Sequence, residues 1–305
     1  MKPNIWRFDS NTNVGEIYVE IWTSKETPRA VIQIVHGMAE HIGRYTDFAA
    51  YLVGHGYAVV MNDQAGHGKS IRDEARRGYF GDKDGGTNLL LDIKDIHERA
   101  VSEFPNVPMV LLGHSMGSFL ARAYAASYPH DFDKYIFSGT AGQNPLLGLG
   151  RIVATIERKR NGAMKPSELL NKISFGSNNK AFEPIRTSSD WLTSDEKIVD
   201  AFVKDPLCGF TFTAEAMLDL FEVMRSVSGI QWAKQVPDLP IFIFSGEKDP
   251  VSSSGKGVRQ VVDWLEKTGH HYVLFKLYEG GRHEMLNEVN KQEVFEDILD
   301  FLQLN

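Results

Sequence analysis

The sequence Gly-His-Ser-Met-Gly at 113–117 places a serine between two glycines, a pattern that suits nucleophilic catalysis. It follows the short apolar run 109–112 and precedes helix-forming residues that continue to Ala126. A strand, a sharp turn and a helix are the setting in which such a serine stands exposed above a sheet. The glycines admit the tight turn, so Ser115 is the candidate nucleophile.

A serine hydroxyl is a weak nucleophile and needs an adjacent base, which an acid in turn orients. Above a parallel sheet, such groups lie at the carboxyl ends of the strands. His270 and His271 stand at the start of the apolar run 272–277, whereas His283 follows it. His283 is therefore the candidate base.

The same rule narrows the choice of the acid. Asp238 precedes the apolar run 241–244 and belongs to the wrong end of its strand, whereas Glu247 and Asp249 both follow the run. The Asp-Pro-Val sequence that begins at Asp249 indicates a tight turn before a new segment, which favours Asp249. Glu247 stays open as the alternative.

Hydrolysis of an acyl group also requires donors that stabilise the developing oxyanion. The candidates are the backbone N–H of Met116, directly after the nucleophile, and that of Met38, in the loop after the first buried strand. His36 and His41 in that loop lack the spacing of zinc ligands, and no His-Glu-x-x-His sequence occurs. We expect no metal and no cofactor.

Apolar runs that alternate with helical periodicity are typical of an α/β fold with a doubly wound, mostly parallel sheet. The runs are 30–35, 57–61, 108–112, 135–137, 241–244 and 272–277. Apolar residues at helical spacing occur in 45–52, 89–100 and 294–302. Before them, the alternation in 16–22 predicts an antiparallel edge strand whose second face is exposed.

The interval 141–213 interrupts this alternation. A connection of that length inside a compact sheet must have structure of its own. We expect a mostly helical cap at 141–213, inserted into an α/β catalytic domain formed by 1–140 and 214–305. Six aromatic side chains are expected to form the core of the cap: Phe175, Phe182, Trp191, Phe202, Phe210 and Phe212.

The composition is that of a globular protein, with 305 residues, 42% hydrophobic residues and a net charge of −7. An acidic balance without a basic block disfavours nucleic acid as a partner. The apolar runs are shorter than the roughly 20 residues that span a bilayer. The N-terminal segment lacks the apolar stretch of a secretory signal, and the single Cys208 cannot form an internal disulfide. These features predict a cytoplasmic protein.

Four segments resemble the α/β-hydrolases, in particular the monoacylglycerol lipase and bacterial lysophospholipase branch. They are HGMAEHIGRY at 36–45, NDQAGHGKS at 62–70, LGHSMG at 112–117 and GEKDPV at 246–251. The resemblance supports Asp249 as the acid and implies that Glu40 and Arg44 lie in a polar pocket for a glycerol-like leaving group. Taken alone, these two residues fit an ordinary ion pair at a helix start equally well. Gln64 and Ser118 depart from the family pattern without touching the triad.

The resemblance implies a serine hydrolase that cleaves small-molecule carboxylic esters, monoacylglycerols or lysophospholipids, through an acyl-enzyme. The alternative is a peptidase or amidase of the proline-iminopeptidase type, which shares this fold and triad. An acidic group in the cap that binds a free amine would favour it, and four residues leave it open: Glu183, Asp190, Asp195 and Glu196. A binding protein with a vestigial site is disfavoured, because all three triad residue types occur in order.

The cap also contains the apolar sequence 146–153, followed by three basic residues at 158–160. A helix with an apolar face and a basic end can bind transiently to a lipid surface. Our hypothesis is that the cap makes such a contact. The alternative is that this segment is an ordinary cap helix whose basic end is solvated.

Overall fold

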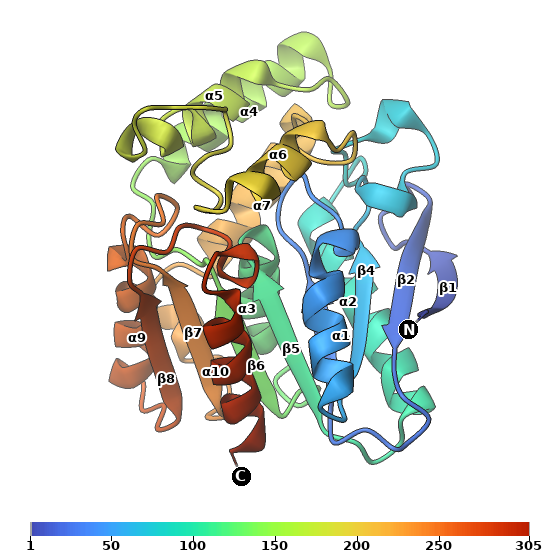
Figure 1. Cartoon of the computed structure of the whole chain (residues 1–305). Coiled ribbons are helices and arrows are strands. Elements are labelled where there is room, and N and C mark those ends of the chain that lie inside the picture. Colours follow the sequence, from blue (N-terminus) through green and yellow to red (C-terminus); the bar gives the residue numbers. More distant parts are fainter. Residues whose placement is uncertain (1, 305) are drawn as a thin grey trace.

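The computed structural model describes residues 2–304 (Figure 1). One mixed sheet of these residues has the strand order β1-β2-β4-β3-β5-β6-β7-β8. The strands are β1 (Asn4–Asp9), β2 (Glu16–Trp22), β3 (Val31–Val35), β4 (Ala58–Asp63), β5 (Met109–His114), β6 (Lys134–Ser138), β7 (Ile241–Gly246) and β8 (Val273–Tyr278). Strands β3 to β8 pair in parallel, and β1 and β2 add an antiparallel margin.

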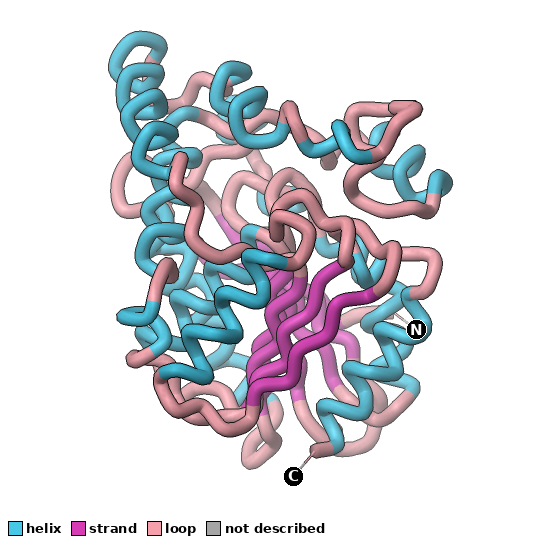
Figure 2. The backbone as a smooth tube through the Cα atoms, turned by 90° about the vertical axis from the view of Figure 1, so that its left-hand side faces the viewer, coloured by secondary structure: helices cyan, strands magenta, loops and turns pink. Residues whose placement is uncertain are grey.

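Helices cover both faces of the sheet, so the fold has three layers (Figure 2). On one face, α1 (Thr46–Gly54) and α10 (Lys291–Gln303) share an apolar cluster with alternate residues of the strands. On the other face, α2 (Gly85–Glu103), α3 (Met116–Ser127) and α9 (Lys256–Lys267) bury the remaining strand side chains. Burial on both faces explains why the central strands are continuous apolar runs. The expected α/β architecture is thus confirmed.

Two expectations for the sheet margins are wrong. The second face of β2 is buried, because Tyr18 and Trp22 pack into the cluster beneath α1. The edge of the sheet is instead β1, which pairs along β2. At the opposite margin, β8 is only partly buried, with Leu274 40% exposed, because an edge strand has neighbours on one side only.

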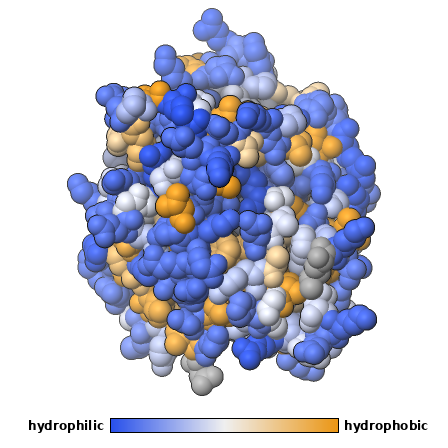
Figure 3. Space-filling view, viewed as in Figure 1, coloured by the Kyte–Doolittle hydropathy of each residue, from blue (hydrophilic) through white to orange (hydrophobic). Residues whose placement is uncertain are grey.

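Between β6 and β7 the chain first forms helices that lie over the carboxyl ends of the strands (Figure 1): α4 (Leu147–Asn161), α5 (Glu168–Phe175), the 3-10 helix η4 (Asn178–Ala181) and α6 (Glu196–Lys204). Two helices follow beside the sheet, α7 (Ala214–Ser226), which packs on α2 and α3, and α8 (Ile230–Ala233), which packs on α3 and α9. Within residues 2–304, no helix combines the length and the apolar character needed to cross a bilayer. On the face seen in Figure 3, hydrophilic residues predominate and apolar ones form small scattered groups.

The aromatic residues of this segment do not form a separate core, contrary to our expectation. Phe212 packs edge to face against Phe80, and Phe210 lies 5.2 Å from the ring of His67, a residue of the loop after β4. Trp191 lies against His283, with ring centroids 5.0 Å apart. A single layer of helices has no second layer of its own to pack on, so these rings are buried on the catalytic domain.

Candidate active site

Ser115 occupies the turn between β5 and α3 with φ 52° and ψ −119°. A positive φ is costly for a residue with a side chain, so the surroundings must enforce it. A Cβ atom on Gly113 would lie 2.2 Å from the carbonyl oxygen of Gly117, and one on Gly117 would lie 2.0 Å from that of Val35. Only glycine fits at either position, and the close approach that results holds Ser115 above the sheet.

His283, in the loop after β8, contacts both other residues of the expected triad. Its Nε2 lies 2.8 Å from Ser115 Oγ, and its Nδ1 lies 3.0 Å from Asp249 Oδ1. Asp249 is fully buried after β7 and accepts further hydrogen bonds from Ser245 Oγ at 2.7 Å and the Val251 N–H at 2.9 Å. A carboxylate only accepts, so Nδ1 carries the proton and Nε2 is free to accept one from the serine.

The alternatives for base and acid lie elsewhere. Glu247 is exposed and accepts a hydrogen bond from the Gly280 N–H at 3.3 Å, with no contact to His283. His271 stands before β8, at the opposite end of the sheet from Ser115, and its Nδ1 lies 2.7 Å from Asp238 Oδ2. The three-dimensional arrangement therefore brings Ser115, His283 and Asp249 together and leaves Glu247 and His271 apart from them.

We expect kcat/KM to fall as the pH is lowered, with the midpoint of this fall at a pH above 6.5. Burial alone would lower the pKa of His283, but the carboxylates of Asp249, Glu284 and Glu40 outweigh it and raise the pKa above its ordinary value of 6.5. A base must be neutral to accept a proton, so kcat/KM rises with pH through this raised pKa. A pH profile of kcat/KM with a soluble ester measures it, and a midpoint at or below 6.5 would contradict the expectation.

The loop after β3 lines the cavity at Ser115 and contains a candidate oxyanion donor, the Met38 N–H. The Gly37 N–H donates to Glu40 Oε1 at 2.6 Å, and the Ala39 N–H donates to His67 Nε2 at 3.2 Å. Between them, the Met38 N–H has no hydrogen-bond partner in the described part of the chain. Met38 is thus available to an oxyanion.

Met116 is the first residue of α3, and an N–H at this position has no acceptor within its helix. The start of the helix also carries a partial positive charge, which favours an anion. Ser118, one of the departures from the family pattern, uses its hydroxyl to donate to the Ser115 carbonyl oxygen at 2.6 Å. It supports the turn and leaves the Met116 N–H free.

Two buried histidines brace the same loop. His36 accepts from the Gln64 N–H at 3.0 Å through Nε2 and donates to the Gly37 carbonyl oxygen at 2.7 Å through Nδ1. His67 donates to the Ala65 carbonyl oxygen at 3.0 Å through Nδ1. Burial lowers the pKa of both imidazoles, so they stay neutral and act as backbone braces.

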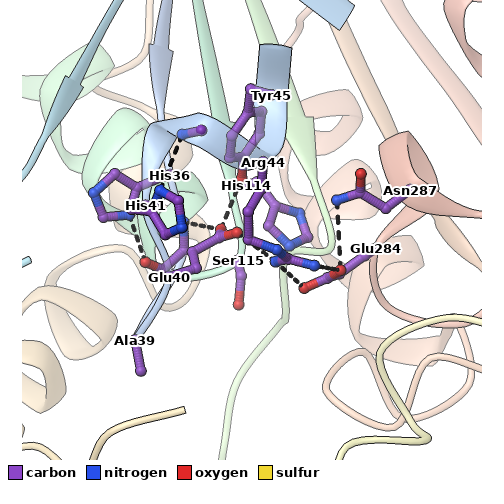
Figure 4. A network of polar contacts seen from close by, with 12 residues as sticks. His36, Ala39, Glu40, His41, Arg44, Tyr45, His114, Ser115, Glu284 and Asn287 are labelled. Carbon is purple, nitrogen blue, oxygen red and sulfur yellow. Dashed lines mark hydrogen bonds and ion pairs between the residues drawn. The ribbon is translucent and has the colours of Figure 1, made fainter. Parts of the chain in front are cut away.

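Glu40 and Arg44 belong to an ion-pair network beside the nucleophile (Figure 4). Arg44 Nη1 lies 2.6 Å from Glu40 Oε2 and 2.6 Å from Glu284 Oε1, and Nη2 lies 2.5 Å from Glu284 Oε2. Tyr45 donates to Glu40 Oε1 at 2.8 Å. Burial would raise the pKa of Glu40, but Arg44 together with His114 holds it below its ordinary value, so the carboxylate stays charged.

Glu284 is the member of this network that the sequence did not suggest. It follows His283 directly but pairs with Arg44, which is 240 positions away. The network therefore joins the loop that carries Met38 to the loop that carries the base. In the sequence, Glu284 is recognisable only as an acidic residue next to the candidate base, and this position does not indicate that it pairs with Arg44.

A cavity of about 170 Å³ opens above Ser115, between the catalytic domain and the helices over it. Glu40 and Glu284 line it from below, whereas Arg44 does not. Its other walls combine apolar rings with a few polar groups: Met38, His114, Asn171, Phe175, Ser188, Ser189, Trp191, Leu192, Phe202 and Phe210. Such a lining suits an acyl chain next to a small polar group.

One group of side chains in residues 2–304 has a composition that could hold a metal ion: His41, Asp205 and Cys208. His41 Nδ1 accepts from the Gly43 N–H at 3.1 Å, so the proton resides on Nε2, which donates to Asp205 Oδ2 at 2.9 Å. A metal ligand needs a lone pair on that nitrogen. Burial also raises the pKa of the Cys208 thiol, which opposes the thiolate form. The group therefore fits a hydrogen bond between loop and cap better than a metal site.

Comparison with known proteins agrees with this fold. The chain is 27% identical to a monoacylglycerol lipase of Mycolicibacterium smegmatis over 94% of its own length and 92% of the relative. A carboxyl esterase from Bacillus coagulans, solved in complex with glycerol, superposes with a TM-score of 0.93 at 31% identity and covers 99% of this chain and 98% of its own. A lipase in its open form gives a TM-score of 0.89 at 25% identity, covering 98% of each chain.

The family comparison extends over most of the chain. Residues 26–290 match the family described as serine aminopeptidase, S33. This range contains Ser115, Asp249 and His283, together with both expected oxyanion donors. The chain thus belongs to the serine aminopeptidase S33 family of the α/β-hydrolase superfamily.

Proposed function

We propose that this carboxylic ester hydrolase cleaves esters of fatty acids with small neutral alcohols, monoacylglycerols foremost, through an acyl-enzyme on Ser115. The observation that carries the proposal is the position of His283, whose two ring nitrogens lie within hydrogen-bond distance of Ser115 and Asp249. The curated relative from Mycolicibacterium smegmatis, a monoacylglycerol lipase, supports the substrate class.

The reaction follows from these positions. His283 Nε2 takes the proton as Ser115 Oγ attacks the ester carbonyl, and Asp249 stabilises the resulting imidazolium. The N–H groups of Met38 and Met116 hold the oxyanion of the tetrahedral intermediate. His283 then returns the proton to the leaving alcohol, and water repeats the sequence to release the acid.

The charges around the cavity favour a neutral alcohol over a phosphodiester. Glu40 and Glu284 both line it and share the single guanidinium of Arg44, and no Lys or Arg of the described residues lines it. Two carboxylates and one guanidinium leave a net negative charge beside the cavity, which disfavours an anionic headgroup, whereas the hydroxyl groups of glycerol can donate to a carboxylate. The Bacillus coagulans esterase that this chain resembles was solved with glycerol bound.

We expect monoacylglycerols to be hydrolysed with a higher kcat/KM than lysophospholipids of equal chain length. An initial-rate comparison across monoacylglycerols, lysophospholipids, short nitrophenyl esters and an aminoacyl anilide tests this ranking. Turnover of the anilide alone would refute the ester assignment, and a preference for lysophospholipids would refute the role given to the two carboxylates.

The environment of the acidic residues in the cap speaks against a peptidase. An aminopeptidase needs a carboxylate that faces the substrate amine, yet none of Glu183, Asp190, Asp195 and Glu196 lines the cavity. Asp190 accepts from the Thr187 N–H at 2.9 Å and the Thr187 hydroxyl at 2.6 Å, and Asp195 caps α6. Both carboxylates are already occupied with local hydrogen bonds.

We assign residues 141–213 to the cap and propose that it makes transient contact with lipid surfaces. One face of the α4 segment exposes large apolar side chains, with Leu149 60% and Ile152 59% exposed. The basic residues 158–160 end this helix and suit an anionic headgroup layer.

We expect the wild type to sediment with phosphatidylserine-containing vesicles and the variant Ile152→Asp to stay in the supernatant. The substitution adds a charge to the apolar face that would enter the lipid. Hydrolysis of a short soluble ester should be unchanged, because Ile152 lies outside the cavity. Equal binding of both proteins, or of neither, would contradict the contact.

A further inference from the structure

The loop that carries His283 is bonded to the cap segment 190–194. The His283 N–H donates to the Trp191 carbonyl oxygen at 3.4 Å, and the Glu284 N–H donates to the Leu192 carbonyl oxygen at 2.7 Å. The base and its neighbour thus depend on the cap for two backbone hydrogen bonds. The cap therefore contacts the catalytic loop directly, in addition to covering the cavity.

Glu288 joins the two segments from the side of the loop. It is 2% exposed, and its Oε1 accepts from the Ser194 N–H at 2.9 Å. Thr193 Oγ1 lies 3.1 Å from the same oxygen and 3.0 Å from the Asn287 carbonyl oxygen, and its single proton is shared between these two acceptors. Glu288 Oε2 accepts from the N–H of Arg282, the residue before the base, at 3.1 Å. One buried carboxylate therefore holds a backbone group of the cap and a backbone group of the catalytic loop.

Arg282 adds a second bond between the same segments. Its guanidinium donates to the carbonyl oxygens of Asp190 and Thr193 and lies 4.3 Å from the ring of Phe182. It does not pair with Glu288 as a salt bridge, so the carboxylate of Glu288 is balanced by N–H and hydroxyl donors alone. Hydrogen bonds to an ionised group are about twice as strong as neutral ones, which makes this junction rigid.

The junction acts on the base through Trp191. This ring lies 5.0 Å from the imidazole of His283, tilted by 37°, on the cap side of the cavity. It limits the imidazole to the orientation in which Nε2 meets Ser115 and keeps water from that side of the ring. Displacing segment 190–194 would free the imidazole to turn and expose it to solvent.

We propose that Glu288 is a positioning residue that couples the cap to the catalytic base, so that His283 is aligned only while the segment 190–194 is docked. The inference rests on the proposed roles of Ser115 and His283. It makes the position of the cap a condition for catalysis, in addition to a condition for substrate binding.

The variant Glu288→Gln keeps the shape but places an amide NH₂ against the backbone N–H groups of Ser194 or Arg282, which can only donate. We expect kcat to fall about 10- to 100-fold with a much smaller change in KM, because a displacement of about 1 Å costs on this order. The loss of Trp191 as a cover relieves the burial of His283, so the acid limb of kcat/KM moves to higher pH. The titratable groups that face His283 are unchanged in the variant: Asp249, Glu284, Glu40 and His114.

Two further variants complete the experiment. Thr193→Val removes a donor to Glu288 from the cap side with little change of shape, and we expect the same shifts at smaller size. Glu293→Gln is the matched control, since Glu293 is exposed on α10 and pairs with Lys276 at 2.8 Å. It should match the wild type in kcat and in pH profile.

The outcomes separate this inference from the proposed function. If a fluorophosphonate probe fails to label the wild type at Ser115, the proposed function is wrong. The coupling is wrong if the wild type is labelled and the folded variant Glu288→Gln keeps the wild-type kcat and acid limb. If Glu288→Gln does not fold, the same result with Thr193→Val shows that the coupling is wrong. A lower melting temperature without either kinetic change also overturns it, because that is the result of a purely structural role.

Discussion

Replacing Ser115 with alanine is expected to lower kcat for ester hydrolysis by about 10⁶-fold. The change removes the hydroxyl oxygen that lies 2.8 Å from His283 Nε2 and is the proposed nucleophile. Alanine keeps the Cβ atom, so the turn with φ 52° and its neighbouring glycines is undisturbed. Single-turnover hydrolysis of a nitrophenyl ester and labelling by a fluorophosphonate probe measure the loss.

The matched control for this prediction is Ser127→Ala. Ser127 is an exposed residue at the end of the same helix, α3, far along the chain from the turn. It should retain full labelling and wild-type rates. Labelling that persists in Ser115→Ala would place the nucleophile elsewhere and refute the assignment.

Replacing Asp249 with asparagine is expected to lower kcat by about 10⁴-fold. The carboxylate now accepts from His283 Nδ1 at 3.0 Å, which leaves Nε2 as the proton acceptor for Ser115. An asparagine amide that donates to Nδ1 selects the other tautomer, in which Nε2 already carries a proton. Because Asp249 also raises the pKa of His283, the residual activity should decline at a lower pH than in the wild type.

The control is the acid that the sequence left open. Glu247→Gln removes a carboxylate that is exposed and bonded to the Gly280 N–H, away from the base. Its kcat and acid limb should stay close to those of the wild type. If Glu247→Gln were as impaired as Asp249→Asn, the choice of Asp249 as the orienting acid would be wrong.

The α/β architecture could be predicted from the sequence because each buried strand is a local signal. Central strands such as β5 are covered on both faces, so their residues are continuously apolar and their boundaries are visible. The edges of the sheet could not be predicted as well from the sequence. The second face of β2 was expected to be exposed because it contains Glu16 and Glu20. It is buried because Tyr18 and Trp22 pack beneath α1, and the buried Glu20 accepts hydrogen bonds from Tyr18 Oη and Lys69 Nζ.

The candidate site divides in the same way. Ser115 and His283 could be selected because parallel strands end at one edge of the sheet, so side chains that follow such strands lie close together. The same rule left Asp249 and Glu247 as candidates for the acid, and the turn at Asp249 and the family resemblance favoured Asp249. Glu284 and Glu288 could not, because their roles come from Arg44 and from Ser194, which lie far away along the chain. A buried carboxylate carries no local mark of the donor that will satisfy it.

The aromatic residues of the cap show the reason most plainly. Their types indicated burial, but not the surface that buries them. Trp191 meets His283, and Phe212 meets Phe80, because the cap is a single layer that can pack only on the domain beneath it. The central strands, their order and the residues at the strand ends could be predicted because they follow from local patterns. The distant groups that hold the base in place emerge only from the fold, because such contacts arise from packing and from the need to satisfy buried charge.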